Sequence, residues 1–288
     1  QLWIFQKIFR NLNLVTALTK VYGRLRKLDP STGVTSDQGF EFNVSPDAKY
    51  NQKRYEALGE IINEHVYDLL EQEGLKKLPL PKESNSPIDT RSFVFGSSDL
   101  SENDKLLILI HGSGVVRAGQ WARRLIINDN LSTGTQIPYV RKARELGYAV
   151  LVLNTNDNYR TIGEKSCKIK VRTCLKDVSQ KHISAKHVAI VAHSYGGECT
   201  LLGVQRIQKL FLCNTYTIVS IASAPCPSSC SQIARNWACS AKPLDTPLPS
   251  ATGDIERVSA GHTVHEMSSS SCMDSIFKFL RERYETRK

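Results

Sequence analysis

The sequence predicts an α/β protein built on a mostly parallel β-sheet flanked by helices. Residues 105–110, 149–154 and 187–193 are runs of branched or small apolar residues, as expected for strands that are buried on both faces. Helical patterns separate the first two runs, and alternation of strand and helix favours a parallel sheet. The third run leads directly into a serine and two glycines, which is the pattern of a sharp turn from strand to helix.

That turn has the sequence Ala192-His193-Ser194-Tyr195-Gly196 and matches a G-x-S-x-G nucleophile elbow, with Ala192 in the first glycine position. Small residues are needed there because the serine backbone is strained and neighbouring elements pack closely. A helix over residues 196–212 should follow, with its N-terminus directed at the serine. We therefore predict an α/β-hydrolase-like fold with Ser194 as nucleophile and the backbone N–H of Tyr195 as an oxyanion donor.

Size and composition fit one large α/β domain with a helical extension. The chain has 288 residues, of which 41% are hydrophobic and 23% are charged, and its net charge is +10. Such a charge suits acidic partners. However, no run of five or more Lys and Arg occurs and no recognition motif accompanies the charge, so direct nucleic-acid binding is not expected. The basic residues between 165 and 176 could bind phosphates, but a solvated connection is the preferred interpretation.

Eight cysteines lie in the C-terminal half without a C-x-x-C pair, which argues against both a disulfide scaffold and a zinc site. A zinc site could be drawn from Cys226, Cys230, His262 and His265, but their spacing is not that of a zinc finger. We expect no metal and no cofactor. No apolar run reaches the ~18 residues that a membrane-spanning helix requires.

Residues 1–75 are expected to form a helical extension packed on the body. Leu12, Val15, Leu18 and Tyr22 lie at helical spacing and predict a helix up to about residue 26. A stronger apolar stripe predicts a second helix over residues 51–74, which Gly74 ends. Three prolines make residues 76–90 a linker, and residues 91–284 form the α/β-hydrolase-like domain.

Within this domain the elements follow in order. Strands are expected at residues 91–95, 105–110, 149–154, 187–193, 216–222 and 257–260, and helices at 119–128, 139–146, 196–212 and 275–284. Residues 225–252 are rich in Ser, Cys and Pro. They are long for a connection and lie where a lid would be placed.

The residues His111-Gly112-Ser113-Gly114 follow the strand at 105–110. In this fold such a turn supplies the other half of the oxyanion hole, and we assign the donors to the amides of Ser113 and Gly114. The alternative is an ordinary glycine-rich turn between a strand and a helix.

Serine hydrolysis needs a base and a carboxylate, in the chain order serine, acid, histidine. His265 stands where the base is expected, with His262 as the near alternative. Glu198 and Glu256 lie in predicted elements, which leaves Asp245 and Asp254 as candidate acids. We take Asp245 as the candidate.

Long stretches resemble the Argonaute-binding-protein-two domain family, in particular its animal cotranscriptional regulator branch. The similarity spans about residues 20 to 280, and it is carried by residues 51–62, 110–128, 191–197, 243–246, 257–261 and 275–279. It implies an α/β-hydrolase-like domain that binds Argonaute and chromatin or splicing proteins, and a role in gene silencing and alternative splicing in nucleus and cytoplasm. By the same resemblance Ser194 and His265 are the family's presumed hydrolase residues.

Two departures from the family pattern bear on activity. Ser223 stands where relatives carry an aspartate, and residues 156–186 are short and irregular where relatives have a charged insert and a full helix. We therefore expect a diverged copy that serves as a gene-regulatory scaffold. The alternative is an active, esterase-like serine hydrolase that uses Ser194 and His265.

Overall fold

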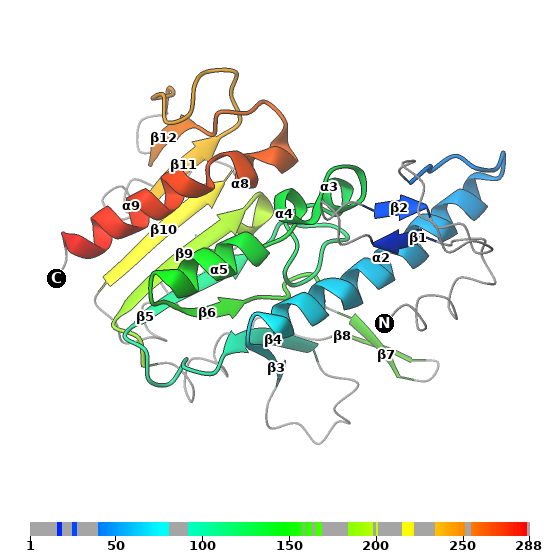
Figure 1. Cartoon of the computed structure of the whole chain (residues 1–288), viewed down its shortest axis with the longest axis horizontal. Coiled ribbons are helices and arrows are strands. Elements are labelled where there is room, and N and C mark those ends of the chain that lie inside the picture. The colour runs from blue at the N-terminus through cyan, green and yellow to red at the C-terminus, as the bar shows by residue number, and fades with distance from the viewer. Residues whose placement is uncertain are drawn as a thin grey trace.

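The computed structural model describes residues 40–80, 92–157, 184–197, 200, 234–250 and 255–286, together with the backbone of five strands elsewhere. An eight-stranded sheet in the order β12-β11-β10-β9-β5-β6-β4-β3 organises these residues (Figure 1). The strands from β12 to β6 are parallel to one another, whereas β4 and β3 are antiparallel at one edge. The strands are β3 (Leu75–Leu80), β4 (Ser92–Ser97), β5 (Lys105–Ile110), β6 (Ala149–Val152), β9 (His187–His193), β10 (Thr215–Ile221), β11 (Ala234–Ala238) and β12 (Glu256–Ser259).

The central strands are buried on both faces. On β5, Leu107 and Leu109 belong to a core cluster that includes Phe279, whereas Ile108 and Ile110 belong to the cluster on the opposite face. Side chains of a strand alternate between faces, so burial on both sides explains why residues 106–110 of β5 are all apolar. The mostly parallel sheet with an elbow serine at the end of β9 is α/β-hydrolase-like, and the predicted fold class is confirmed.

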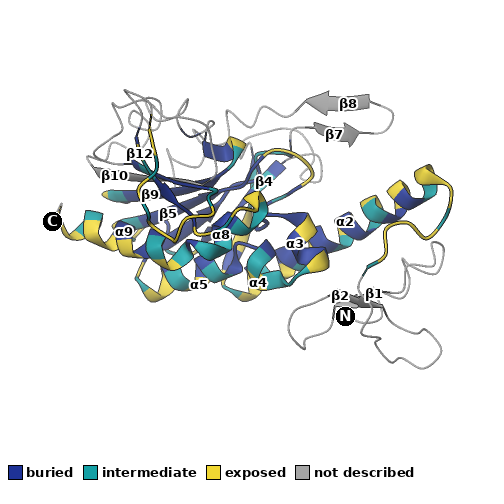
Figure 2. Cartoon of the chain, turned by 90° about the horizontal axis from the view of Figure 1, so that it is seen from above, coloured by how far each residue is buried: buried dark blue, intermediate teal, exposed yellow. Residues whose placement is uncertain are grey.

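The helices α3, α4, α5, α8 and α9 lie on one face of this sheet (Figure 2). The apolar side chains of α5 and α9 pack into the core cluster that contains Leu107 and Leu109. The helices are α2 (Ala48–Gln72), α3 (Arg123–Asn128), α4 (Leu131–Gly134), α5 (Ile137–Glu145), α8 (Ser268–Ser271) and α9 (Met273–Glu285), and a 3₁₀ turn η3 (His265–Met267) precedes α8.

The long helix α2 confirms the helix predicted for residues 51–74. The Asp47 carboxylate caps its start by accepting from the Lys49 N–H at 2.9 Å. It ends before Gly74, which adopts a φ of +84° that favours glycine. Its apolar face, which includes Leu58 and Ile62, packs against Ile126 of α3. Helix α2 is thus attached to the body by buried apolar contacts.

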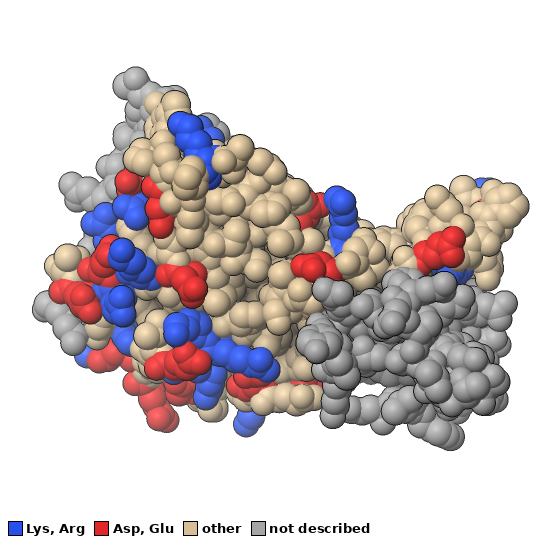
Figure 3. All heavy atoms as spheres, turned by 45° about the horizontal axis from the view of Figure 1, so that its top comes forward, with Lys and Arg blue, Asp and Glu red and all other residues tan. Residues whose placement is uncertain are grey.

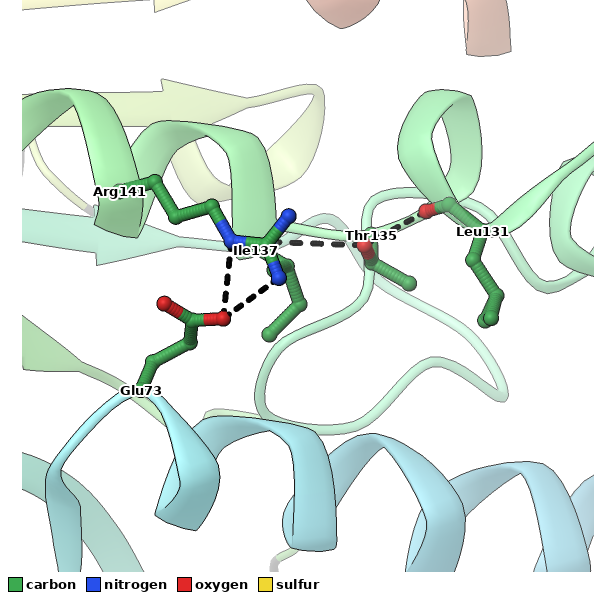
Figure 4. A network of polar contacts seen from close by, with 5 residues as sticks. All are labelled: Glu73, Leu131, Thr135, Ile137 and Arg141. Atoms are coloured by element: carbon green, nitrogen blue, oxygen red, sulfur yellow. Dashed lines mark hydrogen bonds and ion pairs between the residues drawn. The ribbon is translucent and has the colours of Figure 1, made fainter. Parts of the chain in front are cut away.

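A polar contact joins the C-terminal end of α2 to α5 (Figure 4). The Nε and Nη2 atoms of Arg141 donate to the same Glu73 oxygen at 2.8 and 2.6 Å. Nearby, the Thr135 hydroxyl donates to the Leu131 carbonyl at 2.6 Å and accepts from the Ile137 N–H at 3.4 Å, which connects α4 to α5. The Glu73–Arg141 contact thus joins the end of α2 to the middle of α5.

Two expectations for the N-terminal part are wrong. Residues 16–18 and 25–27 form the antiparallel strands β1 and β2, not parts of a helix. Of the four apolar residues that predict the helix, only Leu18 lies in either strand. The prediction of a linker over residues 76–90 is wrong for residues 76–80, which lie in β3 and pair with β4. Pro79 is tolerated because β3 is an edge strand. Residues 81–91 lie outside the described residues.

Three further strands occur where the sequence predicts none. Strands β7 (Tyr159–Ile162) and β8 (Lys165–Lys168) form a hairpin within residues 156–186, for which the sequence predicts an irregular segment. Strand β11 occupies part of the expected lid and extends the parallel sheet between β10 and β12. Most residues of the predicted helix at 196–212, and Ser223, lie outside the described residues.

Candidate active site

Ser194 lies on a strained turn at the end of β9. Its φ is 54°, in the left-handed region that residues other than glycine rarely adopt. Residues 195–197 are helical, so the chain turns sharply from strand to helix at this serine. A Cβ on Gly196 would lie 2.6 Å from the His111 carbonyl oxygen and 3.0 Å from that of Ile110. Only glycine fits there, which explains the small residue in the motif.

The turn after β5 lies directly against the serine. A Cβ on Gly112 would lie 3.0 Å from Ser194 Cβ and 3.5 Å from its Oγ. Ser113 and Gly114 follow at the exposed tip of the turn, and among the described residues their N–H groups have no hydrogen-bond acceptor. The N–H of Tyr195 belongs to the first helical residue and therefore has no acceptor within the helix. The three predicted oxyanion donors thus occur on the two segments that meet at Ser194.

His111 holds this turn in place through hydrogen bonds. It is fully buried, and burial lowers its pKa to about 4, although a hydrogen bond to Gly112 acts in the opposite direction. Its Nε2 accepts from the Thr155 N–H at 3.2 Å, so the proton is on Nδ1, which donates to the Gly112 carbonyl at 2.8 Å. His111 is therefore a neutral structural residue at physiological pH.

His265 reaches the same place from the C-terminal part of the chain. It begins η3, and its ring centroid lies 4.8 Å from that of His193, the residue before the serine. Among the described residues, no hydrogen bond joins Ser194 to His265, so a base role requires the imidazole to move closer to Oγ. The alternative, His262, accepts the Val264 N–H at 2.9 Å within its own loop.

The candidate acid Asp245 has other partners. Its carboxylate accepts from Trp237 Nε1 at 2.8 Å and from the Ser275 hydroxyl. Within the described part of the chain, no hydrogen bond joins this carboxylate to either late histidine. Glu256, which was set aside because of its place in a predicted strand, pairs with Arg235 at 2.7 Å. Asp254 and Glu198 lie outside the described residues.

Sequence reasoning did not single out His193, which is buried between the elbow and α8. The Ser269 hydroxyl lies 2.9 Å from its Nδ1. Burial, followed by the proximity of His265 and His111, lowers the pKa of His193 to about 3, so this imidazole is neutral near pH 7. A histidine at the last position of a buried strand, directly before the nucleophile, is the signal that could have identified it.

The described residues contain no group of three or more His, Cys, Asp or Glu side chains that could hold a metal ion. Cys226 and Cys230 of the weighed zinc site lie outside them. None of the helices in the described ranges is both long and apolar enough to cross a membrane.

Residues 23–173 match the model of the Arb2 domain family. The cotranscriptional regulator ARB2A homolog of Gallus gallus is 39% identical over 318 residues, covering 86% of this chain and 76% of the relative. Human cotranscriptional regulator ARB2A is 36% identical, covering 88% of this chain and 77% of the relative. A Caenorhabditis elegans FAM172 family protein homolog is 39% identical, covering 80% and 77%.

Solved structures show weaker likeness. A histone deacetylase from Saccharomyces cerevisiae has 14% identity and a TM-score of 0.49, covering 79% of this chain and 98% of that one. A bacterial heroin esterase has 18% identity and a TM-score of 0.34, covering 65% and 55%. The fold assignment rests on the sheet and the elbow described above.

Proposed function

Because the chain belongs to the Arb2 domain family, we propose that it acts as a scaffold in the regulation of gene expression, on an α/β-hydrolase fold. The observation that carries this proposal is the 35–39% identity to vertebrate proteins named cotranscriptional regulators, over most of this chain. From the family resemblance we further propose that its partners are Argonaute and chromatin or splicing proteins, and that it works in nucleus and cytoplasm in splicing and silencing.

On the face that Figure 3 shows, the charges suit protein partners better than direct RNA contact. The net charge of +10 is not gathered into one patch on the face that Figure 3 shows, where basic and acidic side chains are interspersed. Nucleic-acid binding proteins instead present a basic stripe or patch that follows the phosphate backbone. The proposal therefore assigns contact with RNA to the partner proteins.

Geometry at the elbow also supports a scaffold. Asp245 is engaged by Trp237 and Ser275, and no described carboxylate is hydrogen-bonded to His265. Loss of the triad acid slows serine hydrolases by about 10⁴. A scaffold does not need this acid, whereas a hydrolase does.

Co-precipitation from nuclear extract tests the scaffold. We expect a tagged chain to enrich Argonaute over an unrelated α/β hydrolase of similar size, and Ser194→Ala to enrich it equally, because binding does not require the nucleophile. Recovery no higher than that of the control hydrolase would remove Argonaute from the proposal. Loss of binding in Ser194→Ala alone would link binding to the catalytic centre.

A second candidate function is a serine hydrolase for a small ester or acyl substrate. It is favoured by the left-handed φ of Ser194 and by N–H groups beside it that have no acceptor among the described residues. Val115, Tyr195 and Val264 adjoin the site residues and are 52%, 51% and 39% exposed, which suits an apolar acyl group. A fluorophosphonate probe tests this function. Label on the wild type that disappears in Ser194→Ala supports it, and an unlabelled wild type rejects it.

A further inference from the structure

Asn156 holds both ends of the turn that carries the predicted oxyanion donors. Its Nδ2 group donates to the Gly112 carbonyl at 2.9 Å and to the Val116 carbonyl at 3.1 Å. Both partners are acceptors, so the side-chain amide must present its NH₂ group to them. The exposed tip, residues 113–115, lies between these two anchors.

The Gly112 carbonyl is held twice, by Asn156 and by the Nδ1–H of His111. The peptide bond is planar and trans, so the Ser113 N–H points away from the carbonyl of the same peptide unit. Fixing this carbonyl therefore fixes the direction of the Ser113 N–H. The same peptide unit begins at Gly112, whose Cα faces the Ser194 side chain.

A second anchor comes from α3. The Arg123 guanidinium of α3 donates to the Val115 carbonyl at 2.8 Å and lies 3.4 Å from the Asn63 side-chain oxygen of α2. The carbonyls of Gly112, Val115 and Val116 are thus all held by side chains from outside the turn. Arg117 also donates to the Val116 carbonyl, at 3.3 Å. Of these four side chains in the described part of the chain, Asn156 is the one that contacts both ends of the turn.

We propose that Asn156 is the positioning residue of the oxyanion turn, acting on the Ser113 amide through the Gly112 carbonyl. This inference rests on the hydrolase function proposed above, because an oxyanion donor contributes to catalysis only if Ser194 is a nucleophile. Its sequence position fits, because β5, β6 and β9 are parallel and their C-terminal ends meet at one edge of the sheet. Asn156 follows β6 there, as Gly112 follows β5 and Ser194 follows β9.

The test uses a readout that does not depend on turnover. Backbone ¹⁵N relaxation of the full chain is measured for the Ser113 and Gly114 amides in the wild type, Asn156→Asp and Asn156→Ala. Asp places an oxygen where the donor was, and Ala removes the donor without adding charge. We expect order parameters of about 0.85 in the wild type and below about 0.6 in both variants. Asn103 supplies the control, because its amide also donates to a backbone carbonyl, that of Gly147 at 3.3 Å, away from this turn. Asn103→Asp and Asn103→Ala should leave the two order parameters unchanged.

Fluorophosphonate labelling of the same proteins separates this inference from the hydrolase candidate. If the wild type is labelled, both Asn156 variants should be labelled about tenfold more slowly. This loss is smaller than the roughly 10²–10³-fold loss in rate when an oxyanion donor is removed outright. An unlabelled wild type with falling order parameters rejects the hydrolase but supports the positioning role. Unchanged order parameters in folded Asn156 variants overturn the positioning role, whatever the labelling shows.

Discussion

At the scale of single residues, Asp245 joins three elements of the C-terminal half. Its carboxylate accepts from Trp237 of β11 and Ser275 of α9, and its N–H donates to the Ser259 carbonyl of β12 at 3.0 Å. Its φ of 64° is in a region that Asp and Asn tolerate better than other side chains do. These contacts support a structural role for Asp245.

Substitution of Asp245 separates this role from catalysis. Asp245→Ala leaves the buried Trp237 Nε1 without an acceptor, so we expect a loss of about 1–3 kcal/mol in the free energy of unfolding. Asp245→Asn keeps an acceptor and should lose less. Urea unfolding measures both. If the wild type reacts with a fluorophosphonate, Asp245→Asn should react within a few-fold of it, and a loss near 10⁴ would restore Asp245 as the acid.

The close approach at Gly196 gives a second prediction. An added methyl group would meet the backbone carbonyls of Ile110 and His111, which cannot move aside as a flexible side chain can. We expect Gly196→Ala to lower the unfolding free energy by about 1–3 kcal/mol or more. Gly74→Ala is the control, since the new Cβ would meet nothing within 4 Å and only the positive φ is strained. Equal losses in the two variants would contradict the tight packing at the elbow.

His193 gives a prediction about pH. Its pKa is about 3 in the folded chain and 6.5 in the unfolded chain, so the unfolded chain binds one more proton between these values. Stability contributed by neutral His193 is therefore complete above pH 6.5 and is lost as pH falls, by up to about 1.4 kcal/mol per pH unit. His193→Asn lacks this contribution. The difference in unfolding free energy between wild type and variant should shrink from pH 7 to pH 5, and a constant difference would contradict the neutral, buried imidazole.

At the scale of elements, buried polar contacts attach α2 more strongly than its surface ion pair does. Asn63 accepts from Gln120 at 2.7 Å and lies 3.4 Å from Arg123, and all three residues are buried. The Glu73–Arg141 pair is at the surface, where such pairs contribute about 0–1 kcal/mol. A buried donor that loses its acceptor costs more.

We therefore expect Asn63→Leu to lower the unfolding free energy by about 2–3 kcal/mol, because it strands the Gln120 amide and part of the Arg123 guanidinium. Glu73→Gln, the surface control, should change it by less than about 1 kcal/mol. Denaturant titrations of both variants measure this. A larger loss for Glu73→Gln than for Asn63→Leu would show that the surface ion pair attaches α2 more strongly than the buried contacts do.

Elements differ in how well the sequence predicts them. The strands at 105–110 and 187–193 and helix α2 have strong periodicity or unbroken apolar runs, and they were found with nearly their observed bounds. Strand β11 was missed because Ala234-Arg235-Asn236-Trp237-Ala238 places polar residues within a buried strand of a segment rich in Ser, Cys and Pro. Strands β1 and β2 were missed because three residues are too few to show the alternating pattern of a strand.

The sequence also predicts part of the candidate site. Ser194, the turn after β5 and His265 follow from motif and chain order, and the structure brings these segments to one edge of the sheet. Their catalytic roles stay predictions. The contacts of Asn156 and His193 were not predictable, because they depend on which loops meet at that edge rather than on local sequence.

At the scale of the whole molecule, the proposed regulator has a hydrolase fold with a strained turn at Ser194. Among the described residues, no carboxylate is hydrogen-bonded to His265. A strained serine persists only when its surroundings hold it. Here Gly112, Gly196 and the packed ends of β5 and β9 do so, and they would remain in a protein that works by binding. The fold therefore accommodates a scaffold without losing its elbow.

The most direct test of this account is RNA sequencing of cells in which the endogenous gene is replaced by wild type, by Ser194→Ala or by no copy. A scaffold predicts that Ser194→Ala restores the wild-type pattern of transcripts and splice isoforms, which differs from the pattern without the gene. If Ser194→Ala instead reproduces the pattern of cells without the gene, at wild-type protein abundance, the serine is required for function and the scaffold account is wrong.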